Sequence, residues 1–397
     1  MSGMREAAFA MAAPSPAVNG ARLAVTRLRL ANFRCYDAAS FDGDTRPVVL
    51  TGPNGAGKTN LLEAISLLAP GRGLRQARLT DIDRRPASAG ADAQTSGWAV
   101  AATVLTALGP VDIGTGLEPD NTRRTVRVNG AAAQGQNALA DYVSVVWLTP
   151  QMDRLFVDGA SARRRFLDRL VFGFDAAHPA RVGAYGHAMR ERLRLLKSGR
   201  RDDGWLNALE DTMATRGIAI AAARRDMANR LASACAQSQG SFPRAGIAAT
   251  GAVEDWLNAG PALDAEDRLR AQLAGGRQGD AESGRTAVGP HLSDLSVWHL
   301  AKDMPAGQCS TGEQKALLIA VVLADARLQA AERGTAPLLL LDEVAAHLDG
   351  QMRHALFAEI RHLGAQAWLT GTDRAVFSEL EPDAQFYTVA NATLTRA

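Results

Sequence analysis

Hydrophobic positions change their spacing along the chain, and the changes divide it into strand-rich ends and a helical middle. Residues 22–36 alternate between apolar and polar side chains, as a half-buried strand does. The β-branched run at 47–50 predicts a buried strand, and the apolar spacing after the next turn predicts a helix. Strand-like runs at 98–107 and 124–128, the second closed by an Asn-Gly turn, predict a mostly antiparallel region beside the main sheet.

The middle of the chain has a different pattern. Residues 160–239 keep a helical spacing and contain few strand-forming residues, which predicts a helical insert. No heptad pattern runs through it without interruption, so we expect a short helical arm without a long coiled coil. The Gly-rich residues 275–287 predict a mobile linker at its end.

Strands and helices alternate again after this linker. Residues 308–332 predict a turn followed by a long helix, and residues 336–343 predict a buried strand that ends in two carboxylates. Because both ends of the chain have this α/β pattern, we predict one α/β domain assembled from two sequence halves. The predicted division is a disordered tail at 1–21, the first half of the domain at 22–160, the helical arm at 161–285 and the second half at 286–397.

Composition changes this picture little. The 397 residues are 47% hydrophobic and carry a formal net charge of +2, which neither favours nor excludes nucleic acid as a partner. Residues 153–230, however, hold 16 basic and 10 acidic residues. That local excess is typical of a face that binds nucleic acid, and equally of an exposed helical pair solvated by arginine.

Cysteine usage and the lack of long apolar runs indicate the compartment. Cys35, Cys235 and Cys309 are too few and too scattered for a disulfide framework or a metal site. No apolar run reaches the roughly 18 residues that a membrane-spanning helix needs. We therefore expect a protein of the cytoplasm with no membrane partner.

A glycine-rich turn after the strand at 47–50 carries the clearest chemistry. Residues 52–59, Gly-Pro-Asn-Gly-Ala-Gly-Lys-Thr, fit G-x-x-x-x-G-K-[ST] between a strand and a helix, which is the context that a phosphate-binding loop requires. Lys58 would reach the β- and γ-phosphates, and the Thr59 hydroxyl would hold Mg²⁺. The residues predicted to bind the nucleotide here are Gly52, Asn54, Gly55, Gly57, Lys58, Thr59 and Asn60.

Two later stretches have the chemistry of a second half of this site. Asp342 at the end of its strand would hold Mg²⁺, and Glu343 would activate the attacking water as general base. Ser310 and Glu313 have the S-x-x-E spacing of a capping box before an apolar run. A well-capped helix start of this kind suits a γ-phosphate, because its partial charge is positive.

The order of these motifs resembles that of the ABC-type, SMC-like ATPases. Ser310 and Gly312 correspond to the signature, Asp342-Glu343 to Walker B, Asp349 to the D-loop and Gln151 to the glutamine of the Q-loop. The resemblance implies an ABC-type P-loop ATPase head with a helical arm. It also implies that ATP and Mg²⁺ bind, with Lys58, Gln151 and Glu343 catalytic and with Gln151 joining Thr59 and Asp342 around the metal. Ser310, Gly312 and Asp349 would meet the nucleotide held by a second copy.

Within that group the chain resembles the RecF family. The motifs that carry the resemblance are residues 28–34 (LRLANFR), 57–65 (GKTNLLEAI), 68–74 (LAPGRGL), 163–168 (RRRFLD) and 289–291 (GPH). The last is normally followed by an arginine and acidic residues but here continues Leu-Ser-Asp, so no role of that arginine can be transferred.

The family resemblance implies a weak DNA-dependent ATPase of recombinational gap repair, replication restart and the response to DNA damage. Such a protein dimerises around ATP on gapped, duplex or single-stranded DNA and helps RecA to load with RecR and RecO. As a hypothesis, phosphate contacts come from Arg163, Arg164, Arg190 and Arg194.

Three alternatives stay open from the sequence. A transporter ATPase subunit shares the head but usually has a histidine where this chain has residues 370–373, Thr-Gly-Thr-Asp. An ATP-gated, non-catalytic scaffold is disfavoured by the intact Glu343. A metabolic kinase is disfavoured because the signature helix would have no role in it.

Overall fold

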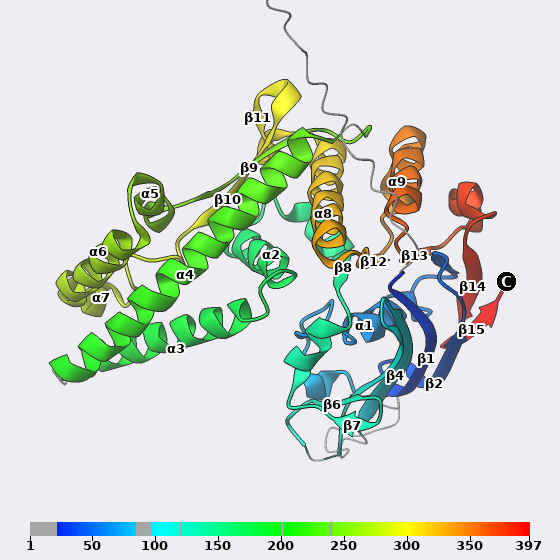
Figure 1. Ribbon diagram of the computed structural model, residues 1–397, viewed down its shortest axis with the longest axis horizontal. Coiled ribbons are helices and arrows are strands. Elements are labelled where there is room, and N and C mark those ends of the chain that lie inside the picture. Colours follow the sequence, from blue (N-terminus) through cyan, green and yellow to red (C-terminus); the bar gives the residue numbers. More distant parts are fainter. Residues whose placement is uncertain (1–21, 85–96, 120, 200–201, 239) are drawn as a thin grey trace, which may run out of the picture.

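The computed structural model describes residues 22–397 except 85–96, 120, 200–201 and 239. The tail predicted at 1–21 lies outside the described residues. The described chain has a head built from two sheets and an elongated arm that leaves it on one side (Figure 1). None of the described helices is both long and apolar enough to cross a membrane.

The first sheet of the head is antiparallel throughout, as predicted. Its strand order is β2-β1-β4-β5-β6-β7. The strands are β1 (Ala24–Phe33), β2 (Tyr36–Asp42), β4 (Trp98–Thr106), β5 (Gly109–Leu117), β6 (Thr125–Val128) and β7 (Ala131–Ala132).

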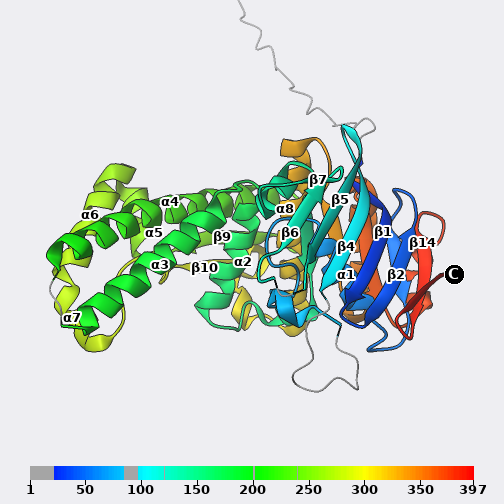
Figure 2. The same ribbon diagram turned by 90° about the horizontal axis from the view of Figure 1, so that it is seen from below.

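The second sheet joins strands from the two ends of the chain, β3 and β8 from the first part and β12 to β15 from the last. Its order is β15-β14-β3-β13-β12-β8, parallel except for the β14–β15 pair. β3 therefore lies between β13 and β14, which come from the other end of the chain. Figure 2 shows the same head from below. The strands are β3 (Val48–Thr51), β8 (Val145–Leu148), β12 (Leu338–Leu341), β13 (Ala367–Gly371), β14 (Gln385–Ala390) and β15 (Thr393–Arg396).

Alternate residues of these strands enter different cores, which explains why the strands are apolar without interruption. Leu338 and Leu340 pack with α1 (Lys58–Ser66) and the first sheet. Leu339 and Leu341 pack on the other side, in the core that contains α8 (Thr311–Arg333) and α9 (Gly350–Leu363). The short 3₁₀ helices are Leu79–Asp81, Gln136–Asp141, Pro150–Arg154, Leu300–Lys302, Ala306–Gln308, Ala345–His347 and Arg374–Leu380.

The arm is helical, as predicted, and its longest helix has 34 residues, so no long coiled coil is present in the described chain. A three-stranded antiparallel sheet, which the sequence pattern did not predict, lies beside α4. The helices are α2 (Ala160–Phe172), α3 (His178–Lys197), α4 (Asp203–Ala236), α5 (Ala252–Ala259), α6 (Ala262–Gly275) and α7 (Arg277–Ser283). The strands are β9 (Ala245–Thr250), β10 (Asp294–His299) and β11 (Met304–Pro305).

The prediction of a mobile linker at 275–287 is wrong. Residues 277–283 form α7, and Asp280 within it is buried. Its carboxylate accepts hydrogen bonds from the buried Arg192 guanidinium at 2.6 Å and from the Ala287 backbone N–H at 3.0 Å. Long-range ion pairing therefore fixes a segment whose glycine-rich composition is typical of a loop.

Candidate nucleotide-binding site

The phosphate loop follows β3 and has the backbone geometry that only glycine adopts readily. Gly52, Gly55 and Gly57 have φ values of +149°, +78° and +115°. A Cβ atom on Gly52 would lie 2.1 Å from the Val389 carbonyl oxygen. Gly57 caps α1 without a side-chain hydrogen bond, so the helix start presents its backbone N–H groups to a ligand.

Lys58 folds back over the loop that precedes it. Its Nζ atom donates to the carbonyl oxygens of Gly52 at 2.7 Å and Pro53 at 2.9 Å. Burial lowers the pKa of Lys58, and the nearby carboxylates of Glu343 and Asp342 oppose that shift. The ammonium group thus lies on the loop where an anionic ligand would meet it.

Thr59 and Asp342 bring the two halves of the predicted site together. The Thr59 hydroxyl is 3.0 and 2.9 Å from the two carboxylate oxygens of Asp342, and the Thr370 hydroxyl donates to the same carboxylate at 2.8 Å. Burial raises the pKa of Asp342, and the two hydroxyl hydrogen bonds partly offset this. Sequence reasoning missed Thr370, because its contact with Asp342 depends on how β13 pairs with β12.

Glu343 follows Asp342 with an unusual backbone. Its φ is +53°, a left-handed conformation that costs a non-glycine residue roughly 1–2 kcal/mol. The backbone N–H of Glu343 donates to the Thr370 hydroxyl at 2.9 Å, which holds this turn. The same threonine therefore fixes both residues of the Walker B pair, and strain of this kind is common at functional sites.

Gln151 lies at the same edge of the sheet as Asp342. Leu148 pairs with Leu341 in parallel register, and the Asp342 N–H donates to the Leu148 carbonyl at 2.9 Å. Gln151 follows in the 3₁₀ helix Pro150–Arg154 with an exposed side chain. Its amide is therefore free to approach a ligand beside Asp342.

Ser310 and Asp349 each cap a helix, and both are exposed. Ser310 and Glu313 form the predicted capping box at the start of α8. Nothing lies within 4 Å of a Cβ atom built on Gly312, and Asp349 accepts from the Met352 N–H at 2.8 Å. Among the described residues, hydrogen bonds join the phosphate loop to Asp342 but not to these helix starts.

Asn60 and the polar side chains near it form hydrogen bonds within the protein. Asn60 donates to the Cys35 sulfur at 3.1 Å and accepts from Arg75 at 2.9 Å. Arg34 forms a bidentate pair with the buried Glu63, at 2.9 and 2.6 Å. Asn54 lies at the exposed tip of the loop.

The four candidate DNA-binding arginines fall into two groups. Arg163 pairs with Asp294 at 2.7 Å, and Arg164 donates to the Ser293 carbonyl at 2.7 Å, so both tie α2 to the start of β10. Arg190 and Arg194 lie exposed on α3, where Arg194 pairs with Glu191. Only the second pair has the accessibility that phosphate contacts require.

Comparisons with known proteins agree with this geometry. Residues 24–395 match the RecF/RecN/SMC N-terminal domain family. The chain is 50% identical over 375 residues to the DNA replication and repair protein RecF of Mesorhizobium japonicum, covering 93% of this chain and 97% of that protein. It is also 50% identical over 379 residues to RecF of Brucella suis, covering 94% and 96% of the two chains.

Solved structures show the same fold. The recombination mediator protein RecF of the RecFOR pathway superposes with a TM-score of 0.81 at 20% identity, covering 94% of this chain and 98% of that one. An Smc head domain from Pyrococcus furiosus gives a TM-score of 0.51 at 15% identity, over 94% and 96% of the two chains. By its sequence and its ABC-type head, the chain belongs to the RecF family of DNA replication and repair proteins.

Proposed function

We propose that the chain is an ATP-dependent DNA-binding protein of recombinational gap repair and replication restart, in which ATP acts as a dimerisation switch. The contact between Thr59 and Asp342 carries this proposal, because it joins a phosphate loop to a Walker B carboxylate. The relatives are DNA replication and repair proteins, and one solved relative is described as RecF-ATP. This family membership favours DNA repair over the transporter alternative.

Each residue of the site has a chemical role in this proposal. The loop N–H groups and Lys58 bind the phosphates, while Glu343 orients and deprotonates the attacking water. The Thr59 hydroxyl, the Asp342 carboxylate and the Gln151 amide oxygen are hard oxygen donors that suit Mg²⁺. No group of three His, Cys, Asp or Glu side chains among the described residues can hold a metal alone. Phosphate oxygens and water would therefore supply the remaining ligands.

The second copy supplies what one chain lacks. Ser310, Gly312 and Asp349 are exposed at helix starts and have no hydrogen bond to the phosphate loop of their own described chain. We infer that they close over the nucleotide of a partner protomer, arranged head to tail. Hydrolysis of ATP then opens this dimer. We infer that the hydrolysis is slow and depends on DNA.

The arm and the head together would grip DNA. Exposed arginines such as Arg190 and Arg194 give phosphate contacts that carry affinity without reading sequence. Because a solved relative belongs to the RecFOR pathway, we infer RecR and RecO as partners and assistance to RecA loading as the outcome. The protein would act in the cytoplasm, where its DNA substrate lies.

Binding to a gapped duplex and sedimentation velocity, each with and without ATP, test this function. The proposal expects ATP to convert monomers to dimers, to tighten DNA binding, and to give a steep loss of affinity between low and moderate salt. DNA binding that is indifferent to both ATP and salt would contradict it.

A further inference from the structure

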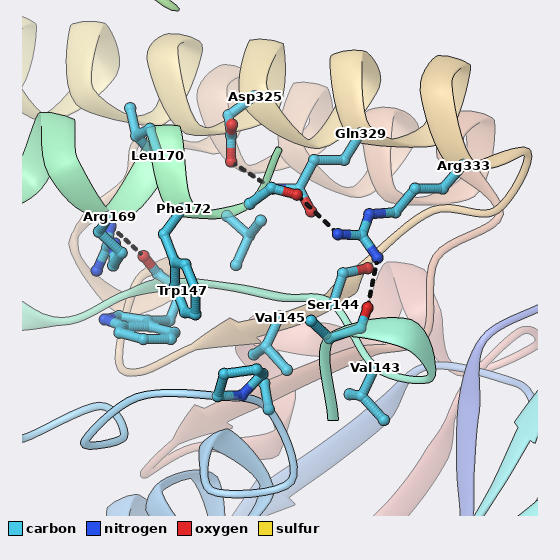
Figure 3. Close-up of a pocket in the computed structure, with 15 residues that line it drawn as sticks. Val143, Ser144, Val145, Trp147, Arg169, Leu170, Phe172, Asp325, Gln329 and Arg333 are labelled. Carbon is cyan, nitrogen blue, oxygen red and sulfur yellow. Dashed lines mark hydrogen bonds between the residues drawn. The ribbon is translucent and has the colours of Figure 1, made fainter. Parts of the chain in front are cut away.

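A small cavity of about 50 Å³ lies where the arm joins the head, away from the phosphate loop (Figure 3). Its walls include the C-terminal half of α8, strand β8 and the C-terminal end of α2. Most of the lining is apolar, but Asp325 and Gln329 of α8 project into it one helical turn apart. The side chains of both are almost wholly buried, at 1% and 2% exposure.

Each of these two side chains has one buried oxygen without a partner in the described chain. The Gln329 Nε2 atom donates to Asp325 Oδ2 at 2.9 Å, which leaves Asp325 Oδ1 and Gln329 Oε1 unpaired. Both atoms are acceptors when the carboxyl group is ionised, and an unpaired buried acceptor costs about 1–3 kcal/mol. A single proton on Oδ1 turns that atom into a donor, which matches the acceptor Oε1 in chemical type.

We propose that Asp325 and Gln329 form a proton-dependent acid–amide pair in α8. When Asp325 loses its proton, the carboxylate draws Arg169 of α2 away from the 3₁₀ helix Pro150–Arg154, which contains Gln151. The pair is closed by two hydrogen bonds when Asp325 is protonated. Loss of that proton leaves a buried carboxylate that must find a cation.

The charges that face Asp325 identify Arg169 as that cation. Burial raises the pKa of Asp325 to about 7, and Arg169, Gln329 and Arg230 lower it by smaller amounts. Arg230 of α4 already pairs with Glu332 at 2.7 Å. Arg333, at the far end of the cavity, donates to two backbone carbonyls, those of Ala140 and Gly173.

Arg169 has no carboxylate partner among the described residues, and it also lies 5.3 Å from the centroid of the Phe166 ring. Its guanidinium lies 4.5 Å from the centroid of the Trp147 ring, 3.4 Å from the Trp147 carbonyl oxygen and 3.7 Å from the Met152 sulfur. Burial lowers its pKa to about 10, so the group remains a cation at neutral pH. An ionised Asp325 therefore competes well for it, since charge-assisted hydrogen bonds are the stronger kind.

Arg169 lies between two spaces, which gives its movement a consequence. It lines both the cavity beside Asp325 and an open groove of about 560 Å³ that Gln151 and Met152 also line. When Arg169 turns toward Asp325, Trp147 and Met152 lose its support, and Gln151 is the residue next to Met152. This last step rests on the proposed function of Gln151, whereas the protonation of Asp325 does not.

Urea unfolding from about pH 5 to about pH 8 tests the acid–amide pair. The folded protein holds the Asp325 proton more tightly than the unfolded chain, so stability is lost as pH rises up to about 7 and then levels off. Asp325→Asn keeps both hydrogen bonds without a titrating group. Relative to this variant, the folding constant of the wild type should fall by roughly tenfold per pH unit below the plateau. Asp211→Asn, at an exposed site on α4, is the matched control and should follow the wild type.

Parallel pH curves for wild type and Asp325→Asn would overturn the proposal, because a buried water could then satisfy both oxygens at every pH. Should Asp325→Asn not fold, Trp147 fluorescence gives a second test, read as the difference between wild type and Trp147→Phe. Departure of Arg169 from the ring predicts a change with a midpoint near pH 7, and a flat titration would contradict it. The step to Gln151 is tested separately: Asp325→Asn should flatten the pH profile of ATP hydrolysis, and a profile unchanged from wild type would remove that step alone.

Discussion

The hydroxyl oxygen of Thr59 lies 3.0 and 2.9 Å from the two carboxylate oxygens of Asp342, although the two residues are 283 positions apart in the sequence. Thr59 follows β3, Asp342 follows β12, and only β13 separates these parallel strands. The whole arm is inserted between the two residues. A site assembled in this way depends on both halves of the head.

Replacing Lys58 with alanine should greatly weaken ATP binding. The ammonium contributes charge-assisted hydrogen bonds to phosphate, and losing about 3 kcal/mol weakens affinity on the order of 100-fold. Lys197→Ala, at the exposed end of α3, should bind as the wild type does. Calorimetric titration with ATP measures both, and equal affinities for all three proteins would mean that Lys58 does not contact the phosphates.

Replacing Glu343 with glutamine should leave ATP binding intact and lower hydrolysis by roughly 10²–10⁴-fold, the usual contribution of a general base. Because ATP then persists, dimers should accumulate in size-exclusion chromatography. The exposed Glu118→Gln serves as control. Unchanged hydrolysis in Glu343→Gln would show that another group activates the water.

The raised pKa of Asp342 predicts how Mg²⁺ dependence varies with pH. Burial makes the folded apoprotein favour the protonated form, whereas the metal needs the carboxylate. The Mg²⁺ concentration for half-maximal hydrolysis should therefore rise as pH falls, starting above the range where an ordinary aspartate titrates. A Mg²⁺ requirement that is constant with pH would contradict this assignment.

Much of the head could be predicted from the sequence because its chemistry is local. The loop at 52–59 and the Ser310 capping box each depend on residues a few positions apart, and a continuous apolar run predicts a buried strand. The Thr370 contact could not be predicted in this way, because it depends on the register between β12 and β13.

The arm was harder to predict because its charges pair over long distances. Its excess of arginine suggested a DNA-binding face, but Arg192 is wholly buried against Glu210 and Asp280. Arg224 of α4 likewise pairs with Asp168 of α2 inside the arm. Composition alone does not distinguish such an arginine from an exposed one. The pair between Arg192 and Asp280 also stabilises α7, where the sequence predicted a linker.

The arginines of the arm should separate DNA binding from stability. Arg190→Ala and Arg194→Ala should weaken binding to any DNA sequence and each reduce the salt dependence by about one phosphate contact, with little change in melting temperature. Arg163→Ala should instead destabilise the fold by on the order of 2 kcal/mol, because Asp294 loses its charged partner. Fluorescence anisotropy measures the DNA binding, and thermal unfolding measures the stability. Normal DNA binding by the Arg190 and Arg194 variants, together with a stable Arg163 variant, would contradict these roles.

A mixing experiment tests most directly the claim that the phosphate loop is half of a site completed by a second copy. Lys58→Ala keeps the signature but lacks the loop lysine, while Gly312→Arg keeps the loop but blocks the signature at a position with open space around it. Each variant alone should hydrolyse little ATP. We expect the mixture to hydrolyse more ATP than the sum of the two variants alone, since each mixed dimer contains one complete site. Hydrolysis equal to that sum at every ratio would mean that the site is not shared between protomers.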